Sequence, residues 1–345
     1  MRAEASVDVA VLSPGTTLGW QRADAAFAAT VRDAGATCAV VPVAIGRAGA
    51  LRVHPALTDA VEALAARHAA GRLPSARALV LSTITAALLQ RPRHPYAIRF
   101  DALAAANRPG AGGAWQRRLE PLALARADLL LPWSAEAGAA TAVATPSIPV
   151  GVPIEMVPGA ATRDIDVLAY AGNPDKRRLD VLSAALAAGD PARRVVVGGI
   201  APEHARHWLA RRGIDAPAGV EWAGIMPREA WLATLARARA FVNASHFEDH
   251  GLAPLEALSA GAALVTVPSP GPYPALAMAR ALAPELVAAD RSAAALAAAL
   301  AAAGRLTDAE LRAYAIRAET LLVPHRREAI ARTVREAVLP ALGVR

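Results

Sequence analysis

Short apolar runs alternate with helix-length segments along almost the whole chain, and this alternation restricts the possible folds more than any other feature. Strands are expected at residues 7–12, 38–43, 78–82, 96–100, 129–132, 166–170, 194–197, 220–222, 240–243, 263–267 and 285–287. Apolar residues recur at helical spacing between them, as in residues 24–33, 177–188, 202–212 and 228–238. A repeated strand-then-helix order predicts an α/β protein with doubly wound parallel sheets.

The chain is long enough for two domains, because 345 residues exceed the usual size of a single hydrophobic core. Residues 145–164 contain four prolines and two glycines without a strong period, which is typical of an interdomain linker. We therefore expect two Rossmann-like domains, residues 1–155 and 156–324. Thr307 and Glu310 form a capping-box pattern before a helix, and a last helix at about residues 325–345 is expected to return to the first domain.

Composition narrows the class of protein. Hydrophobic residues make up 54% of the chain and charged residues 19%, which is typical of a globular protein. No apolar run reaches the ~20 residues that span a bilayer, and the amino-terminal residues lack a signal-peptide pattern, so a cytoplasmic protein is expected. Cys38 is the only cysteine, which excludes an internal disulfide and a multi-cysteine metal site.

The net charge of +7 raises the question of a polyanionic partner. The arginines are scattered among acidic residues, without a basic tail or an aromatic and basic platform. This distribution favours a solvated surface over a nucleic-acid site. It is compatible with an anionic substrate or with a transient contact with a membrane surface.

The most informative local stretch is residues 247–256. Glu248 lies in a turn that follows an expected strand, Gly251 and Leu252 open a helix, and Glu256 lies about two turns into that helix. A helix start leaves backbone N–H groups without intrahelical partners, and the helix dipole favours an anion such as a diphosphate there. The two carboxylates are placed to hold two different parts of one ligand, as a nucleotide sugar would require.

Two other strand-to-helix turns carry candidate ligand groups. Gly172 and Asn173 follow the first expected strand of the second domain, and they are succeeded by Lys176, the only lysine of the chain, and Arg177. Cations at this edge of a parallel sheet are suited to a diphosphate, although a solvated helix start explains them equally well. The second turn follows Gly224. The backbone amides and carbonyls of Ile225 and Met226 could bind the edge of a nucleotide base there, or the turn is an ordinary strand-to-helix corner.

Together these motifs resemble the retaining glycosyltransferases with the GT-B fold, in particular the large family 4, also called group 1. The resemblance is best over residues 166–268, where the glycine turn with its basic residues, the Gly224 corner and the two glutamates occur in family order. It implies two Rossmann-like domains that face each other across a cleft. It also implies transfer of a sugar from a nucleotide-diphosphate sugar, UDP- or GDP-linked, with retention of anomeric configuration and without a required metal or other cofactor.

The resemblance assigns roles residue by residue. Glu248 would contact hydroxyls of the donor sugar and Glu256 those of the ribose. Lys176 and Arg177 would bind the diphosphate, together with the amides of Gly251 and Leu252. The acceptor, which we expect to be a saccharide, a lipid-linked molecule or a small molecule, stays unidentified at this stage.

The first domain offers a less specific pattern. Gly15 and Thr16 follow the first strand, at a position that approaches the donor or the acceptor in the resembling family, but they do not form a dinucleotide fingerprint. Asp101 stands where many relatives have a histidine; it is a catalytic candidate or the cap of the next helix. The other acceptor-side candidates are Arg99, Asn107 and Arg108.

Several alternatives stay open on sequence grounds. A nucleotide-sugar epimerase of the same two-domain shape is the nearest enzyme, and a basic polyanion-binding protein is the alternative that is not an enzyme. His94, His246 and His250 lack acidic or sulfur partners at ligand spacing, so no metal site is expected.

Overall fold

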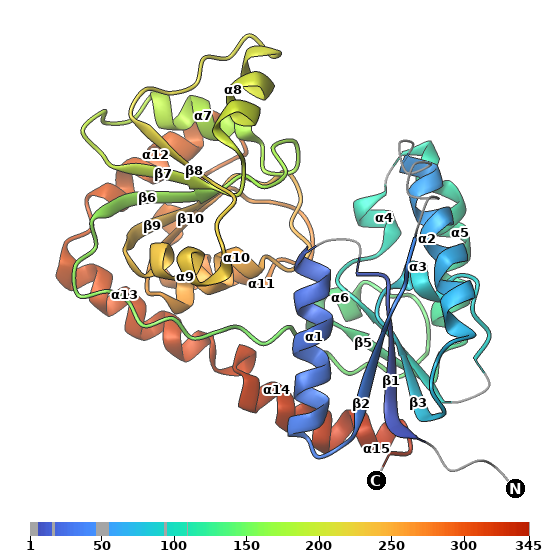
Figure 1. Ribbon diagram of the computed structural model, residues 1–345. Coiled ribbons are helices and arrows are strands. Elements are labelled where there is room, and N and C mark those ends of the chain that lie inside the picture. Colours follow the sequence, from blue (N-terminus) through green and yellow to red (C-terminus); the bar gives the residue numbers. More distant parts are fainter. Residues whose placement is uncertain (1–5, 16–17, 46–54, 93–94, 109, 345) are drawn as a thin grey trace, which may run out of the picture. The chain divides into compact units, whose positions relative to one another are not determined.

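A computed structural model describes residues 6–15, 18–45, 55–92, 95–108 and 110–344 of the chain. The chain divides into two compact units (Figure 1). Unit 1 consists of residues 1–153 and 325–345, and unit 2 of residues 154–324. Among the described helices, none is long and apolar enough to cross a membrane.

Unit 1 is built on a five-stranded sheet in which every pairing is parallel. Its strands are β1 (Val7–Ser13), β2 (Cys38–Pro42), β3 (Ala76–Leu81), β4 (Tyr96–Phe100) and β5 (Leu129–Pro132). The sheet order is β2-β1-β3-β4-β5, with β1 and β3 pairing in the middle. This order reverses beside β1, as in a doubly wound sheet, where ligands bind at the carboxyl ends of the strands.

Helices cover this sheet on both faces. They are α1 (Leu18–Asp33), α2 (Pro55–Ala70), α3 (Ile84–Ala87), α4 (Ala104–Asn107), α5 (Ala114–Leu124) and α6 (Ala135–Ala139), with the carboxyl-terminal α14 (Arg327–Thr333) and α15 (Leu339–Ala341). A π-helical turn, Val334–Val338, joins the last two. The terminal segment packs on α1, and Ile330 and Val334 share a core with Phe27 (Figure 1).

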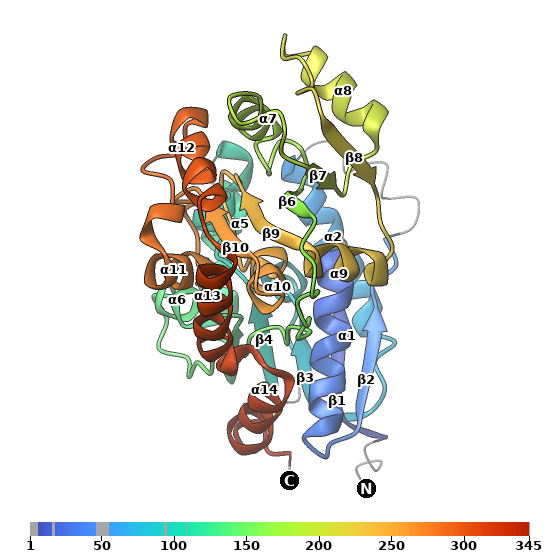
Figure 2. The same ribbon diagram turned by 90° about the vertical axis from the view of Figure 1, so that its left-hand side faces the viewer.

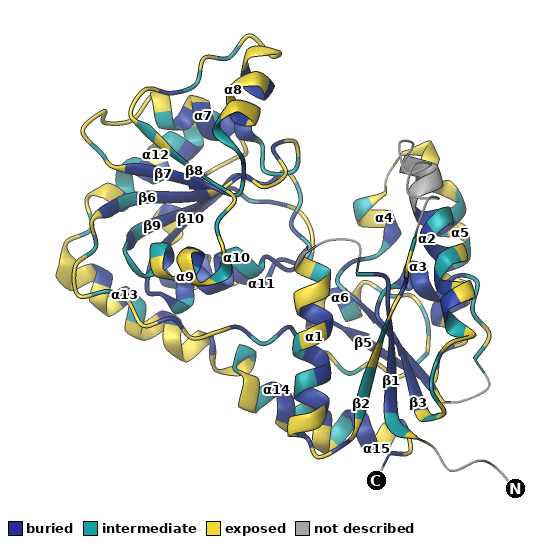
Figure 3. Ribbon diagram, in the orientation of Figure 1, coloured by how far each residue is buried: buried dark blue, intermediate teal, exposed yellow. Residues whose placement is uncertain are grey.

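Unit 2 repeats the architecture. Its parallel strands are β6 (Ile165–Tyr170), β7 (Val195–Gly198), β8 (Val220–Gly224), β9 (Ala238–Asn243) and β10 (Ala263–Thr266), in the order β10-β9-β6-β7-β8. The strands are almost entirely buried, apart from the half-exposed β8 (Figure 3). Strands covered on both faces need near-continuous apolar runs, which is what the sequence supplies here.

The helices of unit 2 are α7 (Leu179–Ala187), α8 (Pro202–Ala210), α9 (Arg228–Ala236), α10 (Leu252–Ser259), α11 (Pro274–Leu282), α12 (Ala293–Gly304) and α13 (Asp308–Leu321). Helix α12 packs beside α7 (Figure 2). The capping box predicted for Thr307 and Glu310 is present at the start of α13. Each side chain binds the other residue's backbone N–H, which satisfies donors that a helix start otherwise exposes.

The two doubly wound parallel sheets confirm the predicted fold class. One predicted strand, residues 285–287, is wrong: the chain forms a 3-10 turn at Pro284–Leu286, and Val287 makes only an isolated bridge to Thr266. Pro284 explains this difference, because its ring fixes φ and favours the first position of a helical turn.

Candidate functional site

The β9–α10 turn has the shape that the sequence predicts. Helix α10 begins at Leu252, and its amino-terminal cap is Gly251, whose φ of 76° lies in the left-handed region that favours glycine. A Cβ at this position would lie 2.7 Å from the Tyr273 ring, so both the conformation and the space require glycine. The chain can therefore turn sharply and present the first amides of the helix at the carboxyl edge of the sheet.

The turn after β6 reaches this edge from the neighbouring strand. Asn173 Oδ1 accepts a hydrogen bond of 3.0 Å from the Lys176 amide, which holds the turn in a local loop. The carbonyl of Lys176 in turn accepts a bond of 3.0 Å from the amide of His246. Arg178, which ends the turn, has φ of 48° and is the one non-glycine residue with positive φ in the described part of the chain. These contacts direct Lys176 and Arg177 toward the β9–α10 turn.

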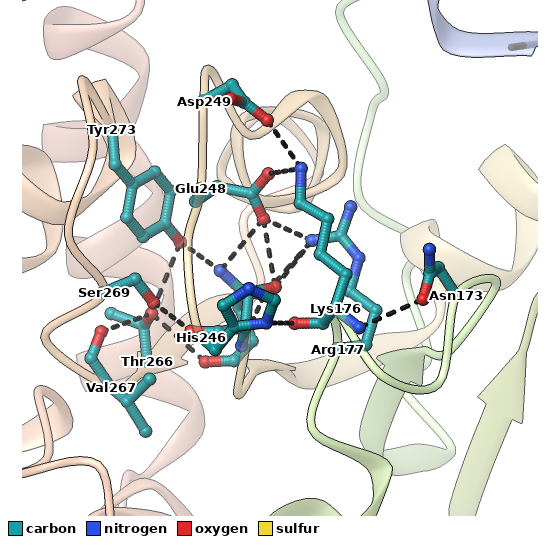
Figure 4. Close-up of polar contacts among 12 residues, drawn as sticks. Asn173, Lys176, Arg177, His246, Glu248, Asp249, Thr266, Val267, Ser269 and Tyr273 are labelled. Atoms are coloured by element: carbon teal, nitrogen blue, oxygen red, sulfur yellow. Dashed lines mark hydrogen bonds and ion pairs between the residues drawn. The ribbon is translucent and has the colours of Figure 1, made fainter. Parts of the chain in front are cut away.

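The two turns meet in a partly buried ion network (Figure 4). Lys176 Nζ lies 2.6 Å from Asp249 Oδ2 and 3.6 Å from Glu248 Oε1. Arg177 Nη1 donates to Glu248 Oε2 and also to Ser245 Oγ, at 2.8 Å from the latter. Glu248 is only 2% exposed, so its carboxylate depends on these donors instead of water.

The charge state of Lys176 follows from its neighbours. Burial lowers the pKa of Lys176, but the carboxylates of Glu248 and Asp249 outweigh it, so the pKa is raised overall. The ammonium is therefore fully charged at neutral pH. A side chain that keeps its charge at the edge of a sheet can neutralise an incoming anion.

Residues that the sequence analysis missed fix Glu248 in place. Ser245 Oγ lies 2.6 Å from Asn243 Oδ1 and 3.2 Å from Glu248 Oε2, so its single proton bonds one of these two oxygens, and Asn243 Nδ2 donates to the Tyr273 hydroxyl at 2.9 Å. Burial raises the pKa of Tyr273, so its hydroxyl stays protonated. Asn243 and Ser245 could have been found as polar residues that end a buried strand; Tyr273, 25 residues after Glu248, gave no such signal.

Glu256 belongs to a second, separate contact group on α10. Arg228 Nη1 lies 2.7 Å from Glu256 Oε1, and Trp231 Nε1 donates to Oε2 at 3.1 Å. The glutamate is 8% exposed, so it is not a solvated acid on the helix surface. Both partners come from α9 and were not predicted. They fix the orientation of the carboxylate.

The Gly224 corner connects β8 to the start of α9. Gly224 has φ of 70°, and Ile225 beyond it is 77% exposed, whereas Met226 is half-buried. Gly172, after β6, leaves no room for a Cβ against the Tyr170 hydroxyl. The three turns of unit 2 thus carry their predicted residues to the carboxyl edge of one sheet, where doubly wound folds bind ligands.

Most candidates of unit 1 lie at the corresponding edge of its own sheet. Gly15 has φ of 53° directly after β1, while Thr16 lies outside the described residues. Asp101 accepts a bond of 2.8 Å from the Ala102 amide, but it does not cap α4, whose cap is Leu103 without a side-chain bond. Helix α4 begins at Ala104, two residues beyond the position that Asp101 could cap, so Asp101 lies in the loop before the helix.

Asn107 and Arg108 follow in the same loop. Asn107 ends α4, and Arg108 Nε lies 3.0 Å from Asp59 Oδ2, which ties the loop to α2. The guanidinium of Arg108 is still 43% exposed at the side chain. It keeps the access to solvent that an acceptor contact would need.

Arg99 does not fit its predicted place beside an acceptor, because its side chain is fully buried. Its Nη1 lies 3.1 Å from Asp24 Oδ1, and its guanidinium stacks within 5 Å of the rings of Phe27 and Trp133. Burial lowers the pKa of Arg99 to about 10, although Asp24 opposes the shift. Its position on an interior strand explains the burial, and the sequence showed only that it stood near a strand end.

A metal centre is not apparent in the described part of the chain, where no group of three His, Cys, Asp or Glu side chains could hold an ion. His246 Nδ1 instead contacts the Lys176 carbonyl at 3.2 Å, and His250 is buried. His94 lies outside the described residues.

Comparison with known proteins finds a family model that matches part of the chain. Residues 166–305 match the sequence model of the family described as Glycosyl transferases group 1. None of the curated proteins matches the sequence.

Solved structures match the whole chain. Sucrose-phosphate synthase from Thermosynechococcus elongatus is 17% identical and aligns with a TM-score of 0.72 over 97% of this chain and 99% of its own. HepE from Anabaena, solved with UDP-glucose, is 12% identical, with a TM-score of 0.72 over 96% and 99%. A glycosyltransferase from Rickettsia africae is 11% identical, with a TM-score of 0.64 over 97% and 98%.

At these identities the structural matches establish the fold alone. The family model is a match of sequence, and it lies within the second unit. The matched segment contains Lys176, Arg177, Glu248 and Glu256. The chain therefore has the two-domain GT-B fold, and its residues 166–305 match the sequence model of the group 1 glycosyltransferases, which the resemblance named.

Proposed function

We propose that the protein transfers a hexosyl group from a nucleotide-diphosphate sugar, UDP- or GDP-linked, to a hydroxyl of an unidentified acceptor in the cytoplasm, with retention of anomeric configuration and without a metal ion. The observation that carries this proposal is the meeting of Lys176 and Arg177 with Glu248 at the start of α10. It joins two cations, a helix start and a carboxylate, which are the groups that a diphosphate and a sugar need.

The diphosphate would bind at Lys176, Arg177 and the amides of Gly251 and Leu252. The two cations are paired with Asp249 and Glu248 in the structure. A diphosphate brings two or more negative charges, so it can compete for the ammonium of Lys176, whose side chain is 30% exposed. The cations then stabilise the charge that develops as the leaving group departs.

Glu256 would bind the ribose hydroxyls. Arg228 and Trp231 occupy one direction at each of its oxygens, and each carboxylate oxygen can accept more than one hydrogen bond. Ile225 and Met226 stand near the start of α9, which also supplies Arg228, so the base would lie by this corner.

The reaction breaks the bond between the anomeric carbon and the diphosphate oxygen, and the bonding electrons leave with the diphosphate. An acceptor hydroxyl oxygen attacks the same face of the anomeric carbon and gives its proton to the departing phosphate oxygen, the nearest base on that face. Glu248 is fixed by Arg177 and Ser245, so it orients the sugar as positive charge develops and does not act as the nucleophile. On the acceptor side, Asp101, Asn107 and Arg108 are the candidate contacts.

Thermal-shift screening with UDP-, GDP-, ADP- and dTDP-sugars tests the donor. A sugar nucleotide at 100 times its dissociation constant stabilises the folded state by about 2.7 kcal/mol, which corresponds to a melting shift of roughly 5–10 °C in the unit that binds it. A shift with one of these donors supports the proposal; the absence of any shift contradicts it.

Proton NMR of the donor and its products separates the enzyme classes. The proposal predicts slow donor hydrolysis without acceptor, and a product with the donor's anomeric configuration once an acceptor is supplied. A donor whose sugar changes configuration at another carbon would identify an epimerase instead.

A further inference from the structure

Unit 1 carries the whole net charge of the protein. It contains 20 arginines and 12 acidic residues, a net charge of +8, whereas unit 2 contains 17 basic and 18 acidic residues, a net charge of −1. The difference is smaller along the sequence, because the last 21 residues, which belong to unit 1, add a further net charge of +3 to it. The excess of basic residues therefore belongs to unit 1.

A groove on unit 1 combines part of this charge with apolar surface. It has a volume of about 820 Å³ and lies between the ends of α2 and α5 and the segment after α3. Its lining residues are Arg67, Leu88, Leu89, Gln90, Arg91, Leu119, Leu122, Ala125 and Arg126. The lining therefore contains three arginines, four leucines and no acidic residue.

Two exposed leucines accompany these arginines. Leu64, next to the lining, and Arg67 are three apart on one face of α2, and Leu122 of α5 lies close to Arg126 in the turn after that helix, because Arg126 Nε donates to the Leu122 carbonyl. Leu64 is 60% exposed and Leu122 is 56% exposed, which places both leucines at the surface beside a cation. Large apolar side chains exposed beside cations are typical of a surface that contacts lipid.

The three arginines of the groove are not engaged by acidic side chains. Within the described residues, Arg67, Arg91 and Arg126 form no ion pair with a carboxylate. Arg126 Nε donates a hydrogen bond of 2.7 Å to the Leu122 carbonyl, which holds the arginine side chain along the end of α5. Their charge is available to an external anion, whereas Arg99 and Arg108 in the same unit are paired with Asp24 and Asp59.

The groove is separate from the candidate acceptor residues. Helices α2 and α5 end directly before β3 and β5, and residues 88–91 precede β4, so the groove lies at the amino ends of these strands. Gly15 and Asp101 follow β1 and β4 at the carboxyl ends, which is the opposite edge of the same sheet. The groove is therefore not part of the acceptor site described above.

We propose that this groove docks unit 1 on a membrane that contains anionic phospholipid. The arginines bind headgroup phosphates, and Leu122 and its neighbours contact the acyl region at the headgroup boundary. This chemistry fits the groove better than a nucleic acid, because a polyanion would use the arginines and leave the exposed leucines without a role. The inference does not depend on the proposed sugar transfer.

Flotation with phospholipid vesicles at about 0.1 M salt tests the proposal. The wild-type protein is expected to float with vesicles of phosphatidylcholine and phosphatidylglycerol, and not with phosphatidylcholine alone. Each arginine near an anionic surface contributes about fivefold to partitioning, so the triple variant R67Q/R91Q/R126Q should bind roughly 100-fold more weakly. The matched control R206Q/R211Q/R305Q removes three exposed arginines from unit 2 and should bind as the wild type does.

The variant Leu122→Ser separates lipid from a general polyanion. The side chain is more than half exposed, so the fold tolerates the change, and binding to anionic vesicles should fall roughly fivefold. Equal losses in the two triple variants, an unchanged L122S, or a wild type that floats equally with neutral vesicles would each overturn the proposal. Melting curves of all variants without vesicles identify any that is misfolded. The variant R67K/R91K/R126K keeps the three positive charges, so it is expected to bind anionic vesicles as the wild type does, and a loss of binding in this folded variant would contradict the proposal.

Discussion

Trp231 offers the sharpest test of how Glu256 acts. The change Trp231→Phe removes the indole N–H that donates to Glu256 Oε2 at 3.1 Å, and it keeps an aromatic ring at the same place. That ring packs edge-on against Tyr170 at 5.5 Å and Phe241 at 6.2 Å, so most of the core contact survives. The change therefore removes one donor from the carboxylate with little loss of packing.

The magnitude follows from the remaining partner. A hydrogen bond to a charged group contributes about 1.5–3 kcal/mol, and Arg228 continues to hold the other oxygen at 2.7 Å. We use the lower value of about 1.5 kcal/mol, because the variant keeps the charge of the Glu256 carboxylate and loses only one of the two contacts that orient it. About 1.5 kcal/mol corresponds to a roughly tenfold higher dissociation constant for the donor, with kcat nearly unchanged, since ribose contacts are the same in the ground and transition states.

Isothermal titration with the stabilising nucleotide diphosphate measures this effect. The matched control is Trp208→Phe on α8: Trp208 is buried to the same degree, and its indole nitrogen has no hydrogen-bond partner among the described residues. The control should bind as tightly as the wild type. If both variants bind equally well, or if W231F changes kcat and leaves binding unchanged, the role assigned to Glu256 is refuted.

Three further predictions concern turnover, pH and the turn itself. Lys176→Ala should lower kcat roughly 10- to 100-fold in a transfer assay, with partial recovery in Lys176→Arg, because a diphosphate leaving group needs the charge; equal rates in all three proteins would contradict this. Burial raises the pKa of Glu120 to about 7, so the folded state keeps a proton that the unfolded state loses above its usual pKa of 4.5, and stability falls as the pH rises through this window. Denaturant unfolding at pH 5 and pH 8 should show Glu120→Gln gaining up to roughly 3 kcal/mol over the wild type, and parallel pH profiles would exclude the shift. Gly251→Ala should lower the melting temperature more than Gly213→Ala, because both have positive φ but only the former meets the Tyr273 ring; equal shifts would show that space does not matter there.

The sequence predicted the fold well because each unit repeats one local pattern. Apolar runs such as the three valines of β7 and residues 240–242 of β9 are buried, and such runs show in the sequence without knowledge of their partners. The failure at residues 285–287 has the same origin: an apolar run that follows a proline has the composition of a strand but not the backbone freedom.

The site was predictable only as far as its residues end strands or begin helices. Lys176 and Glu248 stand at such places, so their proximity follows from the rule that ligands bind at the carboxyl ends of parallel strands. Trp231 and Tyr273 contact the site from elements far along the chain, and nothing local marks them. Arg99 shows the opposite error, since a polar residue near a strand end proved to be buried with Asp24 inside unit 1.

The most direct test of the central claim is a crystal structure of the protein with the nucleotide diphosphate that gives the largest thermal shift. We predict diphosphate density within hydrogen-bond distance of Lys176, Arg177 and the first amides of α10, with the ribose at Glu256. In the same crystal, the contact between Lys176 Nζ and Asp249 Oδ2, 2.6 Å in the structure described above, should be lengthened or broken. Density for the nucleotide at any other place, with the contacts of Lys176 and Glu256 unchanged, would contradict the account.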